Sequence, residues 1–433
     1  MYFLSITIGI FLLWGVAWVI VLFFRYRVAV IGCWQEPVLR RPVVIFESDD
    51  WGPGAAHDAS QLAEIARVLA NYTDTSGRHP VMTLGVVLAV PDGEKMTLAN
   101  CSEYARITLG GCRFATIVEC IHKGAKTGVF DVQLHGMEHY WPDNLLDAMA
   151  ADDEVRALVL QADVLRTEQL PSALQCRWTR LTDASVRSFS EEDMLSDDDI
   201  QKAVRTETEY FNEVFGRPAA VVVPPRFVWN PTVETQWAGS GVNYLVSPGL
   251  MYTGINDQGK LVVGKTDIFN GQVSETGLVY LVRNDYFEPA LGHTTDNVLA
   301  AVAEKTRLGR PTLLEIHRFN FCDSVSASKA ALTALDHAIQ SLLTNHPDVV
   351  FLSTKELGDY YCGATTDREA FDENDLPSTA RSLPKIDLLD PSLTNRIGTF
   401  LERIWARDAL RKWFYISGLF LIIRGLSLGL KMR

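Results

Sequence analysis

The chain has 433 residues, of which 47% are hydrophobic and 21% charged, and its formal net charge at pH 7 is −13. This length fits one large α/β domain with additions at its ends. The negative charge argues against nucleic acid as a partner, because phosphate backbones are bound by basic surfaces. The seven cysteines form no CxxC pair, so we expect reduced thiols rather than a disulfide framework or a zinc ribbon.

The N-terminus contains an uncharged apolar run, residues 4–24, which is long enough to cross a bilayer as a helix. No basic residue precedes the run, so we expect an uncleaved transmembrane anchor over residues 1–27 rather than a signal peptide. Four arginines follow the run: Arg25, Arg27, Arg40 and Arg41. By the positive-inside rule, the rest of the chain is expected in the cytoplasm.

Between residues 42 and 360, short apolar runs with strand character alternate with helical patterns. The expected strands are 43–48, 81–87, 129–134, 219–223, 244–247, 278–282, 312–316 and 349–352. Helices are expected over 58–69, 145–170, 198–215 and 328–344. Continuously apolar strands indicate a parallel sheet that is buried on both faces, and the alternation predicts an irregular β/α barrel. In such barrels the chemistry lies at the carboxyl ends of the strands.

The C-terminal part of the chain is expected to return to the membrane. Residues 361–395 are rich in polar residues and proline and are predicted to be a linker. Residues 396–433 combine a short apolar stretch with flanking basic residues, which is typical of an amphipathic segment in the interface of an anionic membrane. The alternative is a C-terminal helix that docks on the protein's own core.

Four of the expected strands end in polar residues that are suited to one site. Asp49 and Asp50 directly follow the first strand, and two adjacent carboxylates there are costly unless a cation or a proton is shared. His135 and His139 follow the third strand. In a helical turn, two histidines at this spacing face the same way and can share one cation. The alternatives are a turn or helix cap for the acidic pair, and one exposed and one core histidine.

The other two strand ends carry an arginine and a histidine. Arg226 lies between a proline pair and aromatic residues, where it could orient a carboxylate; the alternative is a surface arginine over Trp229. His317 ends the 312–316 strand and could act as a general acid once protonated. A lone histidine in this position is otherwise structural.

These motifs, in this order, resemble those of the polysaccharide deacetylase superfamily, the NodB-homology carbohydrate esterases. The resemblance covers about residues 42–357 and rests on Ser48-Asp49-Asp50-Trp51, His135 with His139, the Arg226 segment and Ile316-His317. It implies an irregular β/α barrel of the deacetylase type. It also implies that Asp50, His135 and His139 hold a divalent metal, for which we expect Zn²⁺.

The resemblance assigns the remaining roles as well. Asp49 would be the base, Arg226 would orient Asp49, and His317 would be the acid. Asp285 is a loose candidate for the family's aspartate that supports the arginine. Trp51 intervenes before Gly52-Pro53, and the arginine segment reads RFVW, so the chain is expected to be a divergent member.

We therefore expect a membrane-anchored, metal-dependent hydrolase that removes an acetyl or formyl group from a carbohydrate or a lipid-linked sugar. One alternative is a glycoside hydrolase on the same barrel, which would need two carboxylates across a cleft, such as Glu47 and Glu315. The other is a non-catalytic carbohydrate-binding membrane protein. Intact Asp49, Asp50 and His317 argue against the non-catalytic alternative.

Overall fold

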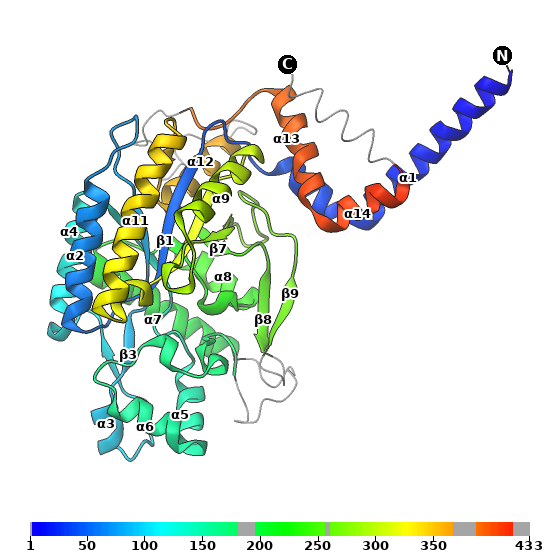
Figure 1. Cartoon of the computed structure of the whole chain (residues 1–433). Helices are drawn as coiled ribbons and strands as arrows, with labels where there is room; N and C mark the ends of the chain where they lie inside the picture. The colour runs from blue at the N-terminus through cyan, green and yellow to red at the C-terminus, as the bar shows by residue number, and fades with distance from the viewer. Residues whose placement is uncertain (1, 181–194, 256–259, 367–386, 419–433) are drawn as a thin grey trace.

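The computed structural model describes residues 2–180, 195–255, 260–366 and 387–418. At its centre is a nine-stranded parallel sheet in the order β10-β7-β6-β5-β2-β1-β12-β11, with β13 paired to the start of β1 (Figure 1). Its strands are β1 (Val43–Trp51), β2 (Met82–Val86), β5 (Phe130–Leu134), β6 (Val221–Val222), β7 (Tyr244–Ser247), β10 (Val279–Val282), β11 (Asp285–Tyr286), β12 (Thr312–His317) and β13 (Val350–Phe351). All eight expected strands are present.

The sheet curls into an irregular barrel, as the sequence predicted. β10 and β11 lie at opposite ends of the strand order, yet only residues 283–284 separate them along the chain. β10 pairs with β7, and β11 pairs with β12. The short link between β10 and β11 therefore joins the two edges of the sheet, and the break between these strands lies at Arg283.

Side chains of β1 alternate between the barrel interior and the surrounding helices. Val43 and Ile45 belong to the interior apolar cluster, whereas Val44 and Phe46 pack in the cluster between sheet and helices. Glu47 is the next residue of β1 in the inward-facing alternation of Val43 and Ile45, and it is fully buried. The interior is thus apolar near the amino ends of the strands and polar towards their carboxyl ends.

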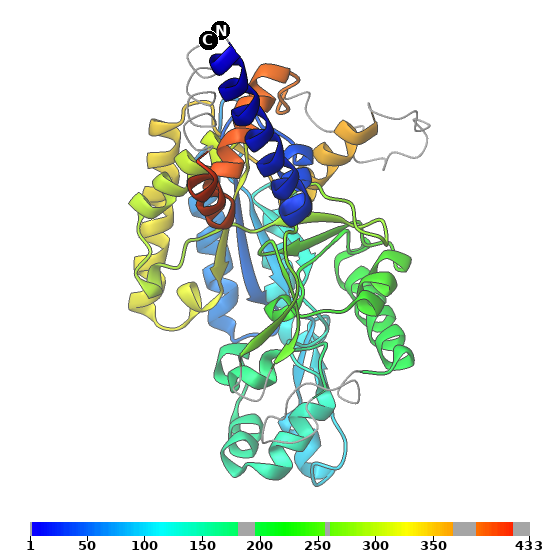
Figure 2. The ribbon, with the colours of Figure 1, turned by 90° about the vertical axis from the view of Figure 1, so that its right-hand side faces the viewer.

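Helices cover the outside of the sheet and extend it at both ends (Figures 1 and 2). They are α1 (Tyr2–Gln35), α2 (Ala56–Ala70), α3 (Gly93–Leu98), α4 (Ala115–Lys126), α5 (Pro142–Ala151), α6 (Asp153–Gln161), α7 (Asp197–Phe215), α8 (Pro231–Gly239), α9 (Thr295–Arg307), α10 (Phe319–Cys322), α11 (Val325–Asn345), α12 (Thr354–Thr366), α13 (Leu393–Ala406) and α14 (Asp408–Ser417). Two antiparallel two-stranded sheets, which the sequence did not predict, are β3 (Ala89–Pro91) with β4 (Arg106–Thr108) and β8 (Met251–Ile255) with β9 (Leu261–Lys265).

One helix prediction is wrong. The expected helix over 145–170 is broken at Asp152, whose backbone is extended (φ −134°, ψ 114°). The Asp152 carboxylate accepts hydrogen bonds from the backbone N–H groups of Glu154 and Val155. Asp152 therefore caps a new helix, α6, because its short polar side chain satisfies N–H groups that a helix start leaves free.

Helix α1 continues to Gln35, beyond the predicted end of the anchor at residue 27. Within the described residues, Leu13–Gln35 is the part long and apolar enough to cross a membrane, and only 11% of its most apolar window is buried. The helix departs from α geometry at Tyr26 (φ −127°, ψ 24°), between Arg25 and Arg27. The charged residues thus coincide with a kink at the end of the uncharged run.

The C-terminal helices pack on α1. The rings of Trp18 and Trp413 are 5.6 Å apart in an edge-to-face contact, and Leu410 and Phe414 are buried in the same cluster. We call α13, α14 and the second half of α1 the collar. Of the predicted linker, residues 367–386 lie outside the described residues, as do residues 419–433 of the predicted C-terminal segment.

A buried arginine fastens the collar to the barrel. Arg403 of α13 is 1% exposed and forms an ion pair with buried Glu36, which also binds Arg310. The Arg403 guanidinium donates to five backbone carbonyl groups, those of Cys33, Glu36, Pro37, Leu308 and Gly309. Since Leu308 and Gly309 lie just before β12, the collar is attached at the amino ends of the strands, and the carboxyl ends face away from it (Figures 1 and 2).

We predict that Arg403→Met destabilises the protein by about 3–5 kcal/mol, because it removes one of the two positive partners of Glu36 and takes a donor from each of the five carbonyl groups. Thermal unfolding of the full chain in detergent measures this. Arg411→Met is the matched control, since Arg411 lies on the exposed face of α14 beside Asp408. Equal stability of the two variants would show that Arg403 does not hold the collar.

Candidate active site

Asp49 and Asp50 both line one cavity at the carboxyl ends of the strands, although neighbours on a strand normally face opposite ways. The pairing of β1 with β2 shifts register between Ser48 and Trp51, which marks a bulge. Within it, Asp50 adopts a left-handed backbone (φ 67°). The bulge turns the Asp50 carboxylate to the side that Asp49 already faces.

Asp50, His135 and His139 converge on one point. The Asp50 Oδ1 atom lies 3.6 Å from the Nε2 atom of each histidine. Two donors about 2.1 Å from a tetrahedral zinc ion are about 3.4 Å apart, so the observed spacing fits a shared cation. All three residues are buried.

The two histidines meet through a loop and not through the helical turn that the sequence suggested. Residues 135–141 contain no helix, and Gly136 has φ +95°. The loop places the two imidazole rings 4.9 Å apart and nearly perpendicular (71°). A side chain at Gly136 would crowd the carbonyl of Glu138, so glycine permits this tight path.

Hydrogen bonding and protonation prepare the imidazoles to bind a metal. His135 Nδ1 lies 2.8 Å from the Val223 carbonyl oxygen, so Nδ1 donates to that oxygen and the ring is oriented with Nε2 towards Asp50. Burial lowers the pKa of His139 to about 4, so its ring is neutral at pH 7. Asp50 Oδ1 is buried and has no hydrogen-bond partner in the described part of the chain. A buried anionic oxygen that faces two imidazole nitrogens and has no hydrogen-bond partner among the described residues fits a divalent cation.

A second cluster, Asp49, Glu315 and His317, lies beside the first. Its positive charge comes from Arg283, which donates to Asp49 Oδ2 at 2.5 Å and to Glu47 at 2.9 Å and lies 3.5 Å from Glu315. Burial would raise the pKa of Asp49, but Arg283 outweighs it and holds that pKa well below its usual range. Burial outweighs Arg283 at Glu315 and raises its pKa. Asp49 is therefore ionised, and the Arg283 guanidinium already supplies the positive charge that the carboxylates of this cluster need.

His317 is held by a buried carboxylate. Its Nδ1 atom lies 2.5 Å from Glu288 Oε1, and its backbone N–H donates to the other Glu288 oxygen. Burial would lower the pKa of His317, but the hydrogen bond to Glu288 and nearby carboxylates, Asp50 among them, raise it to about 10. His317 is thus protonated at neutral pH, with Nε2 on the cavity side.

The arginine that orients Asp49 is not the one expected. Arg226 donates to the Ser172 carbonyl oxygen at 2.9 Å and does not contact Asp49, because the guanidinium of Arg283 occupies that place. Asp285 supports neither arginine; it lies 3.2 Å from Lys305. Of the predicted residues, the structure brings together Asp49, Asp50, His135, His139 and His317, with Arg226 on the wall of the same cavity.

Sequence reasoning missed Arg283 and Glu288. Arg283 directly follows the 278–282 strand, so the strand-end rule used for the other motifs would have singled it out. Glu288 carries no such signal, because it lies in a loop after the two-residue strand β11.

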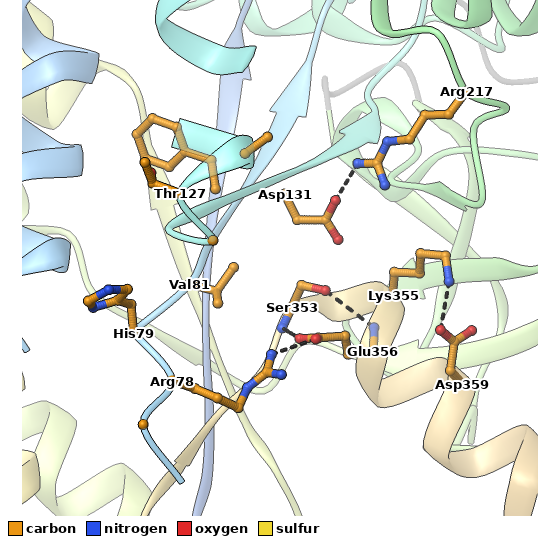
Figure 3. A pocket seen from close by; sticks show the side chains of 14 residues that line it. Arg78, His79, Val81, Thr127, Asp131, Arg217, Ser353, Lys355, Glu356 and Asp359 are labelled. Atoms are coloured by element: carbon orange, nitrogen blue, oxygen red, sulfur yellow. Dashed lines mark hydrogen bonds and ion pairs between the residues drawn. The ribbon is translucent and has the colours of Figure 1, made fainter. Parts of the chain in front are cut away.

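The cavity has a volume of about 480 Å³, within the range of small-ligand sites. Another cavity opens between the amino ends of β2 and β5 and helix α12 (Figure 3). Its charged side chains are paired with each other: Arg217 with Asp131, Arg78 with Glu356, and Lys355 with Asp359. The carboxyl-end cavity, by contrast, contains the buried Asp50 Oδ1 atom, which has no hydrogen-bond partner among the described residues, and we therefore take this cavity as the functional site.

No family model and no curated protein matches the chain. Solved structures with a similar fold include a protein from Mycobacterium smegmatis described as a polysaccharide deacetylase (13% identity, TM-score 0.37, covering 76% of this chain and 95% of that chain). Others are the peptidoglycan deacetylase PdaC from Bacillus subtilis (11%, 0.34, 77% and 96%) and a family 4 acetyl xylan esterase from Clostridium thermocellum in complex with a cobalt ion (12%, 0.33, 73% and 89%).

The raised pKa of His317 predicts its titration. In protein whose metal has been removed with a chelator, we expect His317 to stay protonated well above pH 6.5 and to lose its proton as the pH approaches about 10. The stability that this ion pair contributes is present below pH 6.5 and is lost as the pH rises through that range. Glu288→Gln removes the partner charge and lowers the pKa. Histidine ¹⁵N NMR measures both; an unchanged titration in Glu288→Gln would contradict the pairing.

Proposed function

We propose that the chain is a metal-dependent hydrolase that removes an acyl group, acetyl or formyl, from a carbohydrate at a membrane. The observation that supports this most directly is the convergence of Asp50, His135 and His139 beside Asp49 and His317. Three ligands on one side of an open cavity leave positions for water and substrate, which is typical of catalytic rather than structural metal sites.

Asp50, His135 and His139 would hold the metal, and their two-nitrogen, one-oxygen donor set suits Zn²⁺. When bound, a divalent metal supplies Lewis-acid chemistry: it lowers the pKa of water and polarises the acyl carbonyl.

The neighbouring residues would move the protons. Asp49, ionised and fixed by Arg283, accepts the proton of the attacking water. His317, protonated and oriented by Glu288, donates a proton to the departing amine or hydroxyl. Opposite protonation states at neutral pH suit the two residues to these opposite roles.

The glycoside hydrolase alternative finds no support in the positions of its carboxylates. Glu47 is fully buried and accepts hydrogen bonds from Arg283 and Thr354. Glu315 lies between Arg283 and His317. Both therefore lie on one side of the cavity, and Glu47 has no access to a substrate, whereas glycoside hydrolysis needs two carboxylates that flank the scissile bond.

The position of the anchor constrains the substrate. The collar lies at the amino ends of the strands and the site at their carboxyl ends. The six residue steps of β1 from Val43 to Asp49, at about 3.3 Å each, separate them by about 20 Å. This distance favours a glycan that extends from the membrane, or a soluble sugar, over a sugar attached directly to a lipid headgroup. Arg25 and Arg27 after the apolar run favour a cytoplasmic catalytic domain.

We predict that wild-type protein binds about one equivalent of divalent metal and releases acyl groups from a panel of acylated amino sugars in a chelator-sensitive reaction. Asp49→Asn should keep the metal and lose roughly 10²–10⁴-fold in rate, since only the base is removed. His139→Gln should lose both metal and activity.

Asp348→Asn is the matched control for Asp49→Asn, because Asp348 is exposed in the loop before β13. Metal analysis and acyl-release assays measure the outcome. Chelator-resistant release, or full turnover by Asp49→Asn, would rule out the proposed mechanism.

A further inference from the structure

The charges that line the active-site cavity are mostly negative. Its carboxylates are Asp49, Asp50, Glu168 and Glu315, and in the described part of the chain Arg226 is the one arginine or lysine on its wall. A cavity of this charge repels an anionic ligand except where a metal, the protonated His317 or Arg226 offsets it.

Arg226 has capacity for a ligand. Its one hydrogen bond within the described residues runs from Nη1 to the Ser172 carbonyl oxygen, and no carboxylate of those residues lies within ion-pair distance. A guanidinium has five N–H donors, so four remain available. Arg226 is also not needed to orient Asp49, because Arg283 does so.

The backbone holds Arg226 in an unusual conformation. Arg226 and Phe227 both have positive φ (55° and 56°), which residues with a side chain rarely adopt. The strained pair is fixed on both sides, since Pro225 and Val228 are buried and the Phe227 ring lies under the Arg283 guanidinium at 5.6 Å. Strain that the surroundings maintain is typical of functional sites, and here it directs a half-buried arginine to the cavity.

We propose that Arg226 forms an anion subsite, so that the substrate is an acylated sugar carrying a carboxylate or a phosphate close to the acyl group. This inference rests on the proposed function and narrows its substrate class. A planar guanidinium can donate two parallel hydrogen bonds to either anion. An acidic sugar would offer its carboxylate to Arg226, and a sugar phosphate would offer its phosphate.

The test compares three probes on the full chain in detergent by isothermal titration calorimetry: N-acetylglucosamine, N-acetylglucosamine 1-phosphate and N-acetylmuramic acid. We expect at least one anionic probe to bind about 10-fold or more tightly than the neutral sugar, as a charge-assisted bidentate contact supplies. Arg226→Gln should abolish this preference, and Arg226→Lys should keep part of it as a point charge. The anionic probe that binds more tightly shows whether the subsite takes a carboxylate or a phosphate.

Arg41→Gln, which removes the same charge from an exposed position at the amino edge of the sheet, should keep the wild-type preference. The titrations are repeated after chelation, because phosphate and carboxylate also bind metals. A preference that persists without the metal and is lost in Arg226→Gln belongs to Arg226 and not to the protonated His317 on the same wall. Three results would overturn the subsite: no tighter binding of either anionic probe, a preference that survives in Arg226→Gln, or one that disappears with the metal. Absence of acyl release with the preference intact would overturn the reaction and leave the subsite standing.

Discussion

The guanidinium of Arg283 lies inside the barrel among three carboxylates, and the arrangement of the site depends on this contact. Glu47 and Asp49 reach it from β1, and Glu315 reaches it from β12. Buried carboxylates without a positive partner are costly, so this part of the sequence requires a cation on the barrel axis. Arg283 reaches the axis because it occupies the break between β10 and β11, where the two edges of the sheet meet.

This contact gives two adjacent aspartates different environments. Asp49 stays ionised because the Arg283 guanidinium balances its charge, whereas Asp50, turned aside by the bulge, faces the imidazoles of His135 and His139. The first environment suits a proton acceptor and the second a metal ligand. A single strand end thus supplies two chemical roles, and on the neighbouring strand β12 Glu288 keeps His317 in the opposite protonation state to Asp49.

Much of this was predictable from the sequence. Continuous apolar runs identified the strands, and the rule that parallel strands share a carboxyl edge predicted one site for the polar residues at the strand ends. The resemblance to the deacetylase family then singled out Asp50, His135 and His139 as the metal ligands. Which arginine reaches Asp49 was not predictable, because both Arg226 and Arg283 follow strands and only the path of the closing link decides between them. The bulge at Asp50 also lacks a local signal, since no glycine marks its left-handed residue. At the C-terminus, membrane association and docking on the core were separate alternatives, but α14 packs on the apolar helix α1 itself.

The most direct measurement is an experimental structure of the zinc-loaded protein with anomalous data collected at the zinc absorption edge. The account predicts one peak about 2.0–2.2 Å from an Asp50 oxygen and from the Nε2 atoms of His135 and His139. A peak among Asp49, Glu315 and His317 instead, or Asp50 and the two imidazoles turned to separate sites, would contradict it.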